Sequence, residues 1–312
     1  MQAERDHGGN LDAAMARHGG TRADWIDLST GINPVPWPLP PFDPRDWTAL
    51  PDRVAQDRLV AAARVFWGAP DRADVLAAPG ASALIAAMPR LAAPGRVRID
   101  APTYNEHEAA FVAEGWTPVR EGKADARVLV HPNNPDGRLY TEADANAAFC
   151  VIDESFCDVM PDRSLVRLTA RPGIVVLKSF GKFWGLAGLR LGFAIARPET
   201  IAQLRAMLGP WAVSGPALRI GAAALSDPGW AQATRARLAE DARRLDRVLS
   251  AAGAQVLGGT DLFRLARVAD AAAWQDRLAQ ARIWTRIFPH DPGLIRLGLP
   301  APQDWPRVGA AL

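Results

Sequence analysis

The sequence predicts an α/β fold, with a large domain built on a mostly parallel sheet flanked by helices and a smaller α+β C-terminal domain. Two observations lead to this prediction. Short apolar runs alternate with helical stretches along the first two thirds of the chain, as they do in βαβ units. The length of 312 residues exceeds that of most single compact domains and suits one large and one smaller domain.

The predicted elements follow one another regularly from residue 52 onward. Apolar runs bounded by glycine or proline predict strands, and glycine commonly follows the last turn of a helix, as Gly68 and Gly115 do here. Helices are expected over residues 52–67, from Gly80 to Leu91, and over 104–114, 141–148, 216–225 and 228–252. Strands are expected at 75–77, 97–99, 127–130, 150–152, 174–178 and 191–196.

Three segments make up the predicted domain organisation. Residues 1–29 form an N-terminal arm that joins the small domain, residues 30–225 form the large domain, and residues 226–312 form the small domain. Residues 30–51 hold a dense cluster of prolines. Because proline fixes φ and lacks an amide hydrogen, this stretch is predicted to be extended and neither helix nor central strand. The interleaved aromatic residues are expected to pack, namely Trp37, Phe42 and Trp47.

Charge and composition narrow the class of partner. The formal net charge is only +2 and the basic residues are scattered, so neither a nucleic acid nor a membrane surface is expected as a partner. The two cysteines, Cys150 and Cys157, are too few for a disulfide framework and lack zinc-ligand spacing, so we expect buried thiols and no metal site. The first residues are polar and no stretch is apolar enough to span a membrane, which favours a cytoplasmic protein.

The most informative stretch is SFGKFWGLAGLRLGF, residues 179–193. Lys182 follows a predicted strand, with Ser179 three residues before it and Arg190 eight residues after it. A hydroxyl and a guanidinium are both common phosphate ligands. A lysine between two phosphate ligands can form a Schiff base with the aldehyde of pyridoxal phosphate while the other two hold the phosphate.

This spacing resembles that of the fold-type I pyridoxal-phosphate enzymes, the aspartate aminotransferase superfamily. The resemblance covers nearly the whole chain, in order. It implies that pyridoxal 5′-phosphate is bound covalently to Lys182 and that Ser179 and Arg190 hold its phosphate. It also implies a homodimer, because active sites in this family lie at a subunit interface.

Three further motifs lie in the order that this family has. Asp153 ends an apolar strand, where it could simply cap the next element; the resemblance makes it the anionic partner of the pyridinium nitrogen, which lets the cofactor accept electrons. The turn at residues 131–137 presents Asn134 to the 3′-oxygen of the ring by the same resemblance. Tyr104 is either a core residue or the aromatic residue that stacks on the ring.

The remaining motifs concern anions. Pro79-Gly80-Ala81-Ser82 lies between a strand and a helix and resembles the phosphate cup, with the amides of Ala81 and Ser82 as donors. Arg296 lies in an apolar C-terminal strand, where a charge is costly unless it is paired. The resemblance makes Arg296 the ligand of the substrate α-carboxylate.

The N-terminal motifs resemble threonine-phosphate decarboxylases and their relatives in cobalamin biosynthesis. These motifs are residues 7–11, His-Gly-Gly-Asn-Leu, and residues 27–34, which include Gly31 and Asn33. The resemblance places the loop of Gly31 and Asn33 over the substrate carboxylate and His7 in a basic cluster for the substrate phosphate. Phe156 stands where histidinol-phosphate aminotransferases usually carry tyrosine, and Leu50 stands where the wider group has a tyrosine that reaches the neighbouring subunit.

The implied reaction is decarboxylation of L-threonine O-3-phosphate to (R)-1-aminopropan-2-ol phosphate. A phospho-amino-acid aminotransferase similar to histidinol-phosphate aminotransferase would use the same residues, so the sequence leaves both reactions open. It also leaves open which phosphorylated amino acid is preferred. A non-catalytic regulator that retains the fold is a third reading, against which the presence of Lys182, Asp153 and Arg190 argues.

Overall fold

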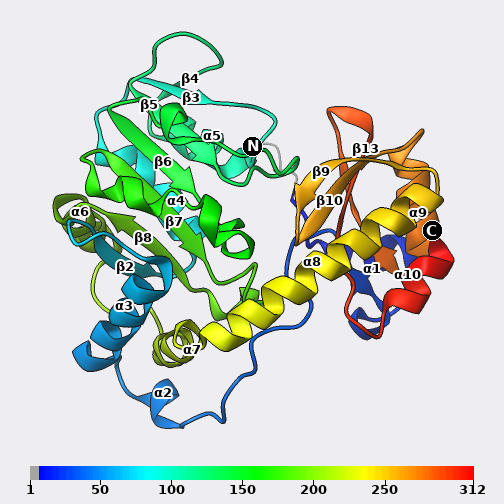
Figure 1. Cartoon of the computed structure of the whole chain (residues 1–312), viewed down its shortest axis with the longest axis horizontal. Helices are drawn as coiled ribbons and strands as arrows, with labels where there is room; N and C mark the ends of the chain where they lie inside the picture. Colours follow the sequence, from blue (N-terminus) through cyan, green and yellow to red (C-terminus); the bar gives the residue numbers. More distant parts are fainter. Residues whose placement is uncertain (1–6) are drawn as a thin grey trace. The chain divides into compact units, whose positions relative to one another are not determined.

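The computed structural model describes residues 7–312, so the first six residues of the predicted arm lie outside the described residues. The chain forms two compact units (Figure 1). The large unit consists of Pro36–Asn134 and Arg138–Gln232. The small unit consists of the N-terminal stretch up to Val35, Pro135–Gly137 and Ala233–Leu312. These boundaries fall slightly after the predicted ones, and the three residues Pro135–Gly137 join the small unit.

The large unit is built on a seven-stranded sheet in the order β2-β8-β7-β6-β5-β3-β4. Its strands are β2 (Asp74–Ala78), β3 (Arg96–Ile99), β4 (Thr117–Val119), β5 (Ala126–Val130), β6 (Phe149–Asp153), β7 (Ile174–Ser179) and β8 (Gly192–Ala196). Strands β3 to β7 pair in parallel, whereas β8 is antiparallel to both β7 and β2. The predicted mostly parallel sheet is therefore confirmed. Strand β4 was not predicted, because it is short, contains Pro118 and lies at the edge.

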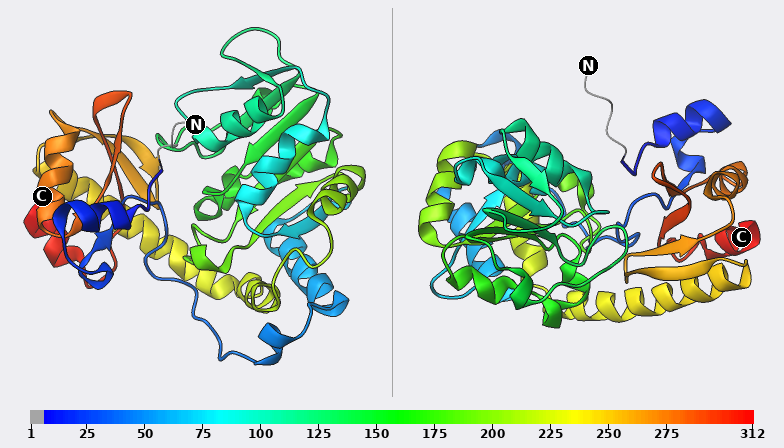
Figure 2. Two further views of the ribbon diagram at one scale, coloured as in Figure 1. Left: turned by 180° about the vertical axis from the view of Figure 1, so that it is seen from behind. Right: turned by 90° about the horizontal axis from the view of Figure 1, so that it is seen from above.

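Helices cover both faces of this sheet (Figure 2). They are α3 (Arg53–Trp67), α4 (Ala81–Ala87), α5 (Asn105–Ala113), α6 (Pro198–Leu208) and α7 (Gly215–Leu225). The short helix α2 (Arg45–Thr48) packs against α7. Helices α4, α5 and α6 share one apolar core with the sheet, to which Leu84, Phe111 and Leu204 contribute. Helix α3 packs against α7.

Two local predictions for the large unit were wrong. Residues 141–148 contain only a 3₁₀ turn at Glu142–Asp144, because the Asp144 carboxylate accepts hydrogen bonds from the amide and hydroxyl of Thr141 and so closes a single turn. Within the proline-rich segment, Arg45–Thr48 forms the short helix α2. This helix follows Pro44, and proline is tolerated at the start of a helix, where no amide donor is needed.

The aromatic residues of the proline-rich segment differ in their surroundings. Trp37 is buried, and its indole donates to Asp227 at 3.2 Å. Phe42 and Trp47 are exposed and contact each other, with ring centroids 5.9 Å apart. The expectation that all three pack into the fold therefore holds only for Trp37.

The small unit has the α+β composition that the sequence predicts. Its antiparallel sheet has the order β12-β13-β10-β9, and β1 and β11 form a separate parallel pair. The strands are β1 (Ile26–Asp27), β9 (Gln255–Thr260), β10 (Phe263–Arg267), β11 (Ile283–Trp284), β12 (Arg286–Phe288) and β13 (Asp291–Gly298). The helices are α1 (Leu11–His18), most of α8 (Pro228–Ala251), α9 (Ala271–Gln280) and α10 (Trp305–Ala311).

Helix α8 is amphipathic. Leu238, Leu245 and Leu249 are fully buried on one side, while arginines and acidic residues occupy much of the rest. Across the described part of the chain, no helix is both long enough and apolar enough to cross a membrane.

Candidate active site

One pocket of the large unit brings together all eight predicted cofactor-binding residues. Its cavity volume is about 140 Å³. Asp153 is the last residue of β6 and Ser179 the last of β7, so the pocket lies at the carboxyl ends of parallel strands, where α/β sheets bind ligands. The eight residues are Ala81, Ser82, Tyr104, Asn134, Asp153, Ser179, Lys182 and Arg190.

One end of the pocket gathers donors suited to a phosphate. Gly80 has φ +84°, and a Cβ atom there would lie 2.6 Å from a guanidinium nitrogen of Arg190, so only glycine allows this approach. Arg190 itself adopts a left-handed φ of 54°, which is uncommon for a residue with a side chain. The Ser179 hydroxyl and the start of α4 at Ala81 line the same pocket. A guanidinium, a hydroxyl and backbone amides together can hold a phosphate.

Lys182 is the only one of the three lysines in the sequence that lines this pocket. Lys123 is exposed, and Lys178 is buried in ion pairs with acidic residues. The Nζ atom of Lys182 lies 5.3 Å from the centroid of the Phe156 ring. Fully buried aromatic residues flank Lys182 in the sequence, namely Phe180, Phe183 and Trp184, so its loop is anchored on both sides.

The two asparagines of the turn after β5 have different surroundings. Asn133 is fully buried, accepts a hydrogen bond from Thr103 at 2.6 Å and donates to the carbonyl of Pro102 at 3.0 Å. It therefore ties the turn to the segment that precedes Tyr104. Asn134 lines the pocket, which is where the predicted contact with a ring oxygen requires it.

Asp153 is a buried carboxylate held by two neighbours. One oxygen lies 2.8 Å from Nε2 of the fully buried His107, and the other accepts hydrogen bonds from the amide and hydroxyl of Ser155. Burial by itself would raise the pKa of Asp153, but His107 and Ser155 outweigh it and lower the pKa. Asp153 is therefore ionised at neutral pH and can pair with a protonated ring nitrogen.

His107 was not predicted as a site residue. It lies on α5 three residues after Tyr104, and the two ring centroids are 6.1 Å apart. Residues three apart share a helix face, so the spacing of Tyr104 and His107 was the available signal. Its partner Asp153 lies 46 residues away in the sequence, and no local pattern indicates that contact.

We expect the His107→Phe variant to raise the pKa of Asp153, because burial then acts with less opposition. In the wild type the folded-state pKa lies below the ordinary value of 3.8. Its contribution to stability is therefore present above that value and is lost as the pH falls through the folded-state pKa. Denaturant unfolding across acidic pH should show a smaller loss in the variant, because its folded-state pKa lies closer to the unfolded-state value. An equal loss of stability at acidic pH in both proteins would mean that His107 does not lower the pKa of Asp153.

The predicted substrate residues of the small unit converge on Ser29. Arg296 on β13 is buried, and its Nη2 donates to the carbonyl of Ser29 at 2.6 Å. The amide of Gly9 donates to the Ser29 hydroxyl at 2.7 Å. A Cβ atom on Gly8 would lie 2.3 Å from the Ser29 carbonyl oxygen. The exposed His7, the loop that contains Gly31 and the strand of Arg296 are thereby brought together.

A second arginine lies opposite Arg296. Arg286 on β12 is its partner in the antiparallel ladder, where directly opposed side chains lie on the same face. Burial and the like charge of Arg286 lower the pKa of Arg296 to about 10, although Asp27 acts in the opposite direction. Two neighbouring guanidinium groups are stabilised by a bound anion. Arg286 was not predicted, because strand pairing cannot be read from its local sequence.

Asn33 has a different environment from the other predicted substrate residues. It is buried, and its side-chain oxygen accepts hydrogen bonds from Arg237 at 2.5 Å and from the amide of Val35 at 3.0 Å. These contacts fix the end of the loop that contains Gly31.

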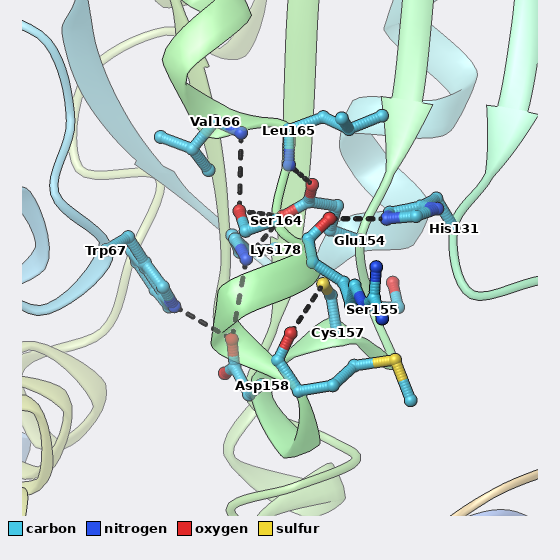
Figure 3. Close-up of polar contacts among 12 residues, drawn as sticks. Trp67, His131, Glu154, Ser155, Cys157, Asp158, Ser164, Leu165, Val166 and Lys178 are labelled. Carbon is cyan, nitrogen blue, oxygen red and sulfur yellow. Dashed lines mark hydrogen bonds and ion pairs between the residues drawn. The ribbon is translucent and has the colours of Figure 1, made fainter. Parts of the chain in front are cut away.

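A cluster of His131, Glu154 and Cys157 has ligand atoms within 4.8 Å of one another (Figure 3). The Nδ1 atom of His131 accepts a hydrogen bond from the amide of Tyr140, and Nε2 donates to the carbonyl of Arg163. Both ring nitrogens are thus engaged within the protein. Cys157 is buried, as predicted, and burial raises the pKa of its thiol, which disfavours the thiolate that a metal requires. The cluster is a set of internal polar contacts.

The chain belongs to the aminotransferase class I and II family, whose model matches residues 24–304. It is 39% identical to threonine-phosphate decarboxylase of Pseudomonas aeruginosa, over 98% of this chain and 97% of that protein. It is 40% identical to a threonine-phosphate decarboxylase of Sinorhizobium sp, over 96% of this chain and 94% of that protein. The fold is similar to that of histidinol-phosphate aminotransferase from Sinorhizobium meliloti, solved with pyridoxal-5′-phosphate, with a TM-score of 0.81, 19% identity and coverage of 97% and 93%.

Proposed function

We propose that the protein uses pyridoxal 5′-phosphate to decarboxylate L-threonine O-3-phosphate, giving (R)-1-aminopropan-2-ol phosphate for cobalamin biosynthesis. The observation that carries this proposal is the similarity, over nearly the full length, to two threonine-phosphate decarboxylases. The pocket of the large unit supports it, because its lining contains an amine, a buried carboxylate and a set of phosphate donors. These are the groups that this cofactor requires.

The residues of the pocket fit the cofactor group by group. Lys182 provides the amine that binds the aldehyde, and Arg190, Ser179 and the amides of Ala81 and Ser82 hold the phosphate. Asn134 would contact the ring oxygen, and Tyr104 would pack against the ring. When bound, pyridoxal phosphate accepts the electron pair that the departing carboxylate leaves on Cα of the substrate.

The protein's own groups control protons at two atoms. The carboxylate of Asp153, whose pKa is lowered, keeps a proton on the ring nitrogen through its negative charge. The amine of Lys182 is the group proposed to deliver a proton to Cα after CO2 has left. Phe156 packs near Lys182 and has no hydroxyl, so hydrogen bonding to the ring oxygen depends on Asn134.

The arginines of the small unit suit a substrate with two anionic groups. L-threonine O-3-phosphate carries a carboxylate and a phosphate. Arg296 and Arg286 lie opposite each other on paired strands, and their mutual repulsion is relieved when anions bind. We assign the carboxylate to Arg296 and place Arg286 and His7 nearest the phosphate.

The test is to mix the cofactor-loaded protein with L-threonine O-3-phosphate in the absence of any keto acid and to measure CO2. Sustained release of CO2 is expected. Conversion to the pyridoxamine form without CO2, reversed by a keto acid, would contradict the proposal and indicate an aminotransferase. L-threonine without phosphate is the matched control, and we expect it to react poorly because it lacks one of the two anionic groups.

We further propose that the chain acts as a homodimer in the cytoplasm. Several large apolar side chains around the proline-rich segment are exposed, including Phe42, Trp47 and Leu50 at 56%, 66% and 68%. Exposed apolar residues gathered in one segment are typical of an interface. Sedimentation velocity that gave only monomers at micromolar concentration would contradict the dimer.

A further inference from the structure

A buried carboxylate that the proposed reaction does not use connects two tryptophans with a lysine. Asp158 is 4% exposed. One oxygen accepts a hydrogen bond from the Trp67 indole at 2.9 Å and lies 3.5 Å from Nζ of Lys178 (Figure 3). The other oxygen accepts a hydrogen bond from the Trp184 indole at 3.1 Å.

Lys178 links this carboxylate to a second one. Its Nζ lies 2.6 Å from Glu154, which also accepts hydrogen bonds from the Ser164 hydroxyl and the amide of Leu165 (Figure 3). Burial by itself would lower the pKa of Lys178, but the charges of Glu154 and Asp158 outweigh it and raise the pKa. Lys178 therefore stays protonated. Every charge of the network has a partner, which is the condition for a stable buried ion cluster.

The residues of this network lie close in the sequence to the predicted site residues Asp153 and Lys182. Glu154 directly follows Asp153 in the sequence. Trp184 comes two residues after Lys182, and Lys178 comes four residues before it. Yet Asp158, Glu154 and Lys178 are not among the residues that line the pocket. Their influence on the site therefore passes through neighbouring residues.

Aromatic rings pack around Trp184, including Phe66 and Phe183, and Asp158 holds its indole nitrogen. The Trp184 ring stacks on Phe180, with centroids 5.0 Å apart and an interplanar angle of 9°, and on Trp230, at 5.4 Å and 12°. Stacked neighbours prevent a ring from tilting but resist sliding and rotation within its plane much less. The hydrogen bond from the ring edge to Asp158 is directional and so opposes that rotation.

We propose that Asp158 is a positioning residue that acts through Trp184 on Lys182. By holding the indole of Trp184, it fixes the loop and thereby places the Lys182 amine for reaction with the cofactor. The ammonium of Lys178, which is itself held by Glu154, keeps Asp158 in place. This inference rests on the proposed role of Lys182 as the cofactor lysine.

The two tryptophans provide a matched pair of variants. Trp184→Phe and Trp67→Phe each remove one indole donor to Asp158, but only Trp184 belongs to the loop of Lys182. After mixing the apo protein with pyridoxal phosphate, samples are reduced with borohydride at intervals and the adduct on Lys182 is quantified by mass spectrometry. We expect Trp184→Phe to slow adduct formation about tenfold, the effect of losing one hydrogen bond to a charged group, and Trp67→Phe to stay within about twofold.

Two further readouts separate positioning from stability. The visible circular dichroism of the bound cofactor should change in Trp184→Phe and stay unchanged in Trp67→Phe. The midpoint temperature of thermal unfolding should fall in both variants. Equal effects of the two variants on the adduct rate would overturn the proposal, because Asp158 would then act only through stability. Should Trp184→Phe not fold, Asp158→Asn replaces it. The two indoles donate to different oxygens of Asp158, and an amide replaces one of these oxygens with an NH2 donor, so slow adduct formation is again expected, and a normal rate would overturn the proposal.

Adduct formation in the wild type shows whether a failure concerns the role of Asp158 or the proposed role of Lys182. If wild-type protein formed no reduced adduct on Lys182, the assignment of the cofactor lysine would fail. If it formed the adduct normally while both tryptophan variants behaved alike, only the role of Asp158 would fail.

Discussion

The Lys182→Ala variant is expected to lose turnover by at least about 10⁴-fold, since a positioned acid–base group alone contributes roughly 10²–10⁴ and this residue is also the one proposed to hold the cofactor. Of the three lysines in the sequence, it is the one that lines the pocket. Lys178 cannot replace it, because that ammonium is buried in ion pairs with Glu154 and Asp158 and its pKa is raised.

The measurement is CO2 release combined with peptide mapping after borohydride reduction. The wild type should carry the reduced cofactor on Lys182, and the variant should carry it nowhere. Lys123→Ala is the matched control, because Lys123 is exposed and its loss should leave both readouts unchanged. A variant that retained a pyridoxyl adduct elsewhere and still turned over would refute the assignment of Lys182.

The Arg296→Gln variant is expected to lose substrate affinity by at least about 30-fold, because removing one partner of a buried charge pair costs about 2 kcal/mol or more. Arg296 is 6% exposed, and with a pKa lowered only to about 10 it remains cationic at neutral pH. A substrate carboxylate bound at Arg296, as proposed, would therefore meet a charge that water screens weakly. Cofactor retention should not change, because the proposed cofactor ligands all belong to the pocket of the large unit.

Two measurements separate substrate affinity from cofactor retention. One is the inhibition constant of L-threonine O-3-phosphate or an unreactive analogue, and the other is the dissociation constant of the cofactor. Arg286→Gln is the matched control. It removes the neighbouring charge from a less buried position, so its effect should be smaller and should depend on the phosphate group of the ligand. Loss of cofactor from Arg296→Gln, with substrate affinity unchanged, would contradict the assigned role.

Local patterns predicted most elements of the large unit. Helix α3 begins after Asp52, whose side chain accepts from the amide of Ala55, and ends at Gly68 in a left-handed conformation. Both signals lie within a few residues of the helix, so the sequence shows them directly. The predicted helix over residues 141–148 was wrong because of another local contact. The side chain of Asp144 bonds to Thr141 and closes a turn instead.

The cofactor motif was also readable from the sequence alone. Ser179, Lys182 and Arg190 lie within twelve residues of one another, and the turn and strand that present them are local structures. The spacing of residue types was therefore enough to predict a lysine between two phosphate ligands. Asp153 ends β6 and Asn134 lies in the turn after β5, and the carboxyl ends of neighbouring parallel strands meet at one edge of a sheet.

Only the tertiary structure decided which distant residues tune these groups. His107 and Asp153 are 46 residues apart, and Arg296 and Ser29 are 267 apart. Arg286 faces Arg296 through strand register, and Asp158 joins Trp67 to Trp184. The sequence by itself determined the family and predicted the lysine and the order of the motifs, because these depend on residue types at short spacing. The charge environment of the site depends on contacts that form only when the sheet and its helices pack together.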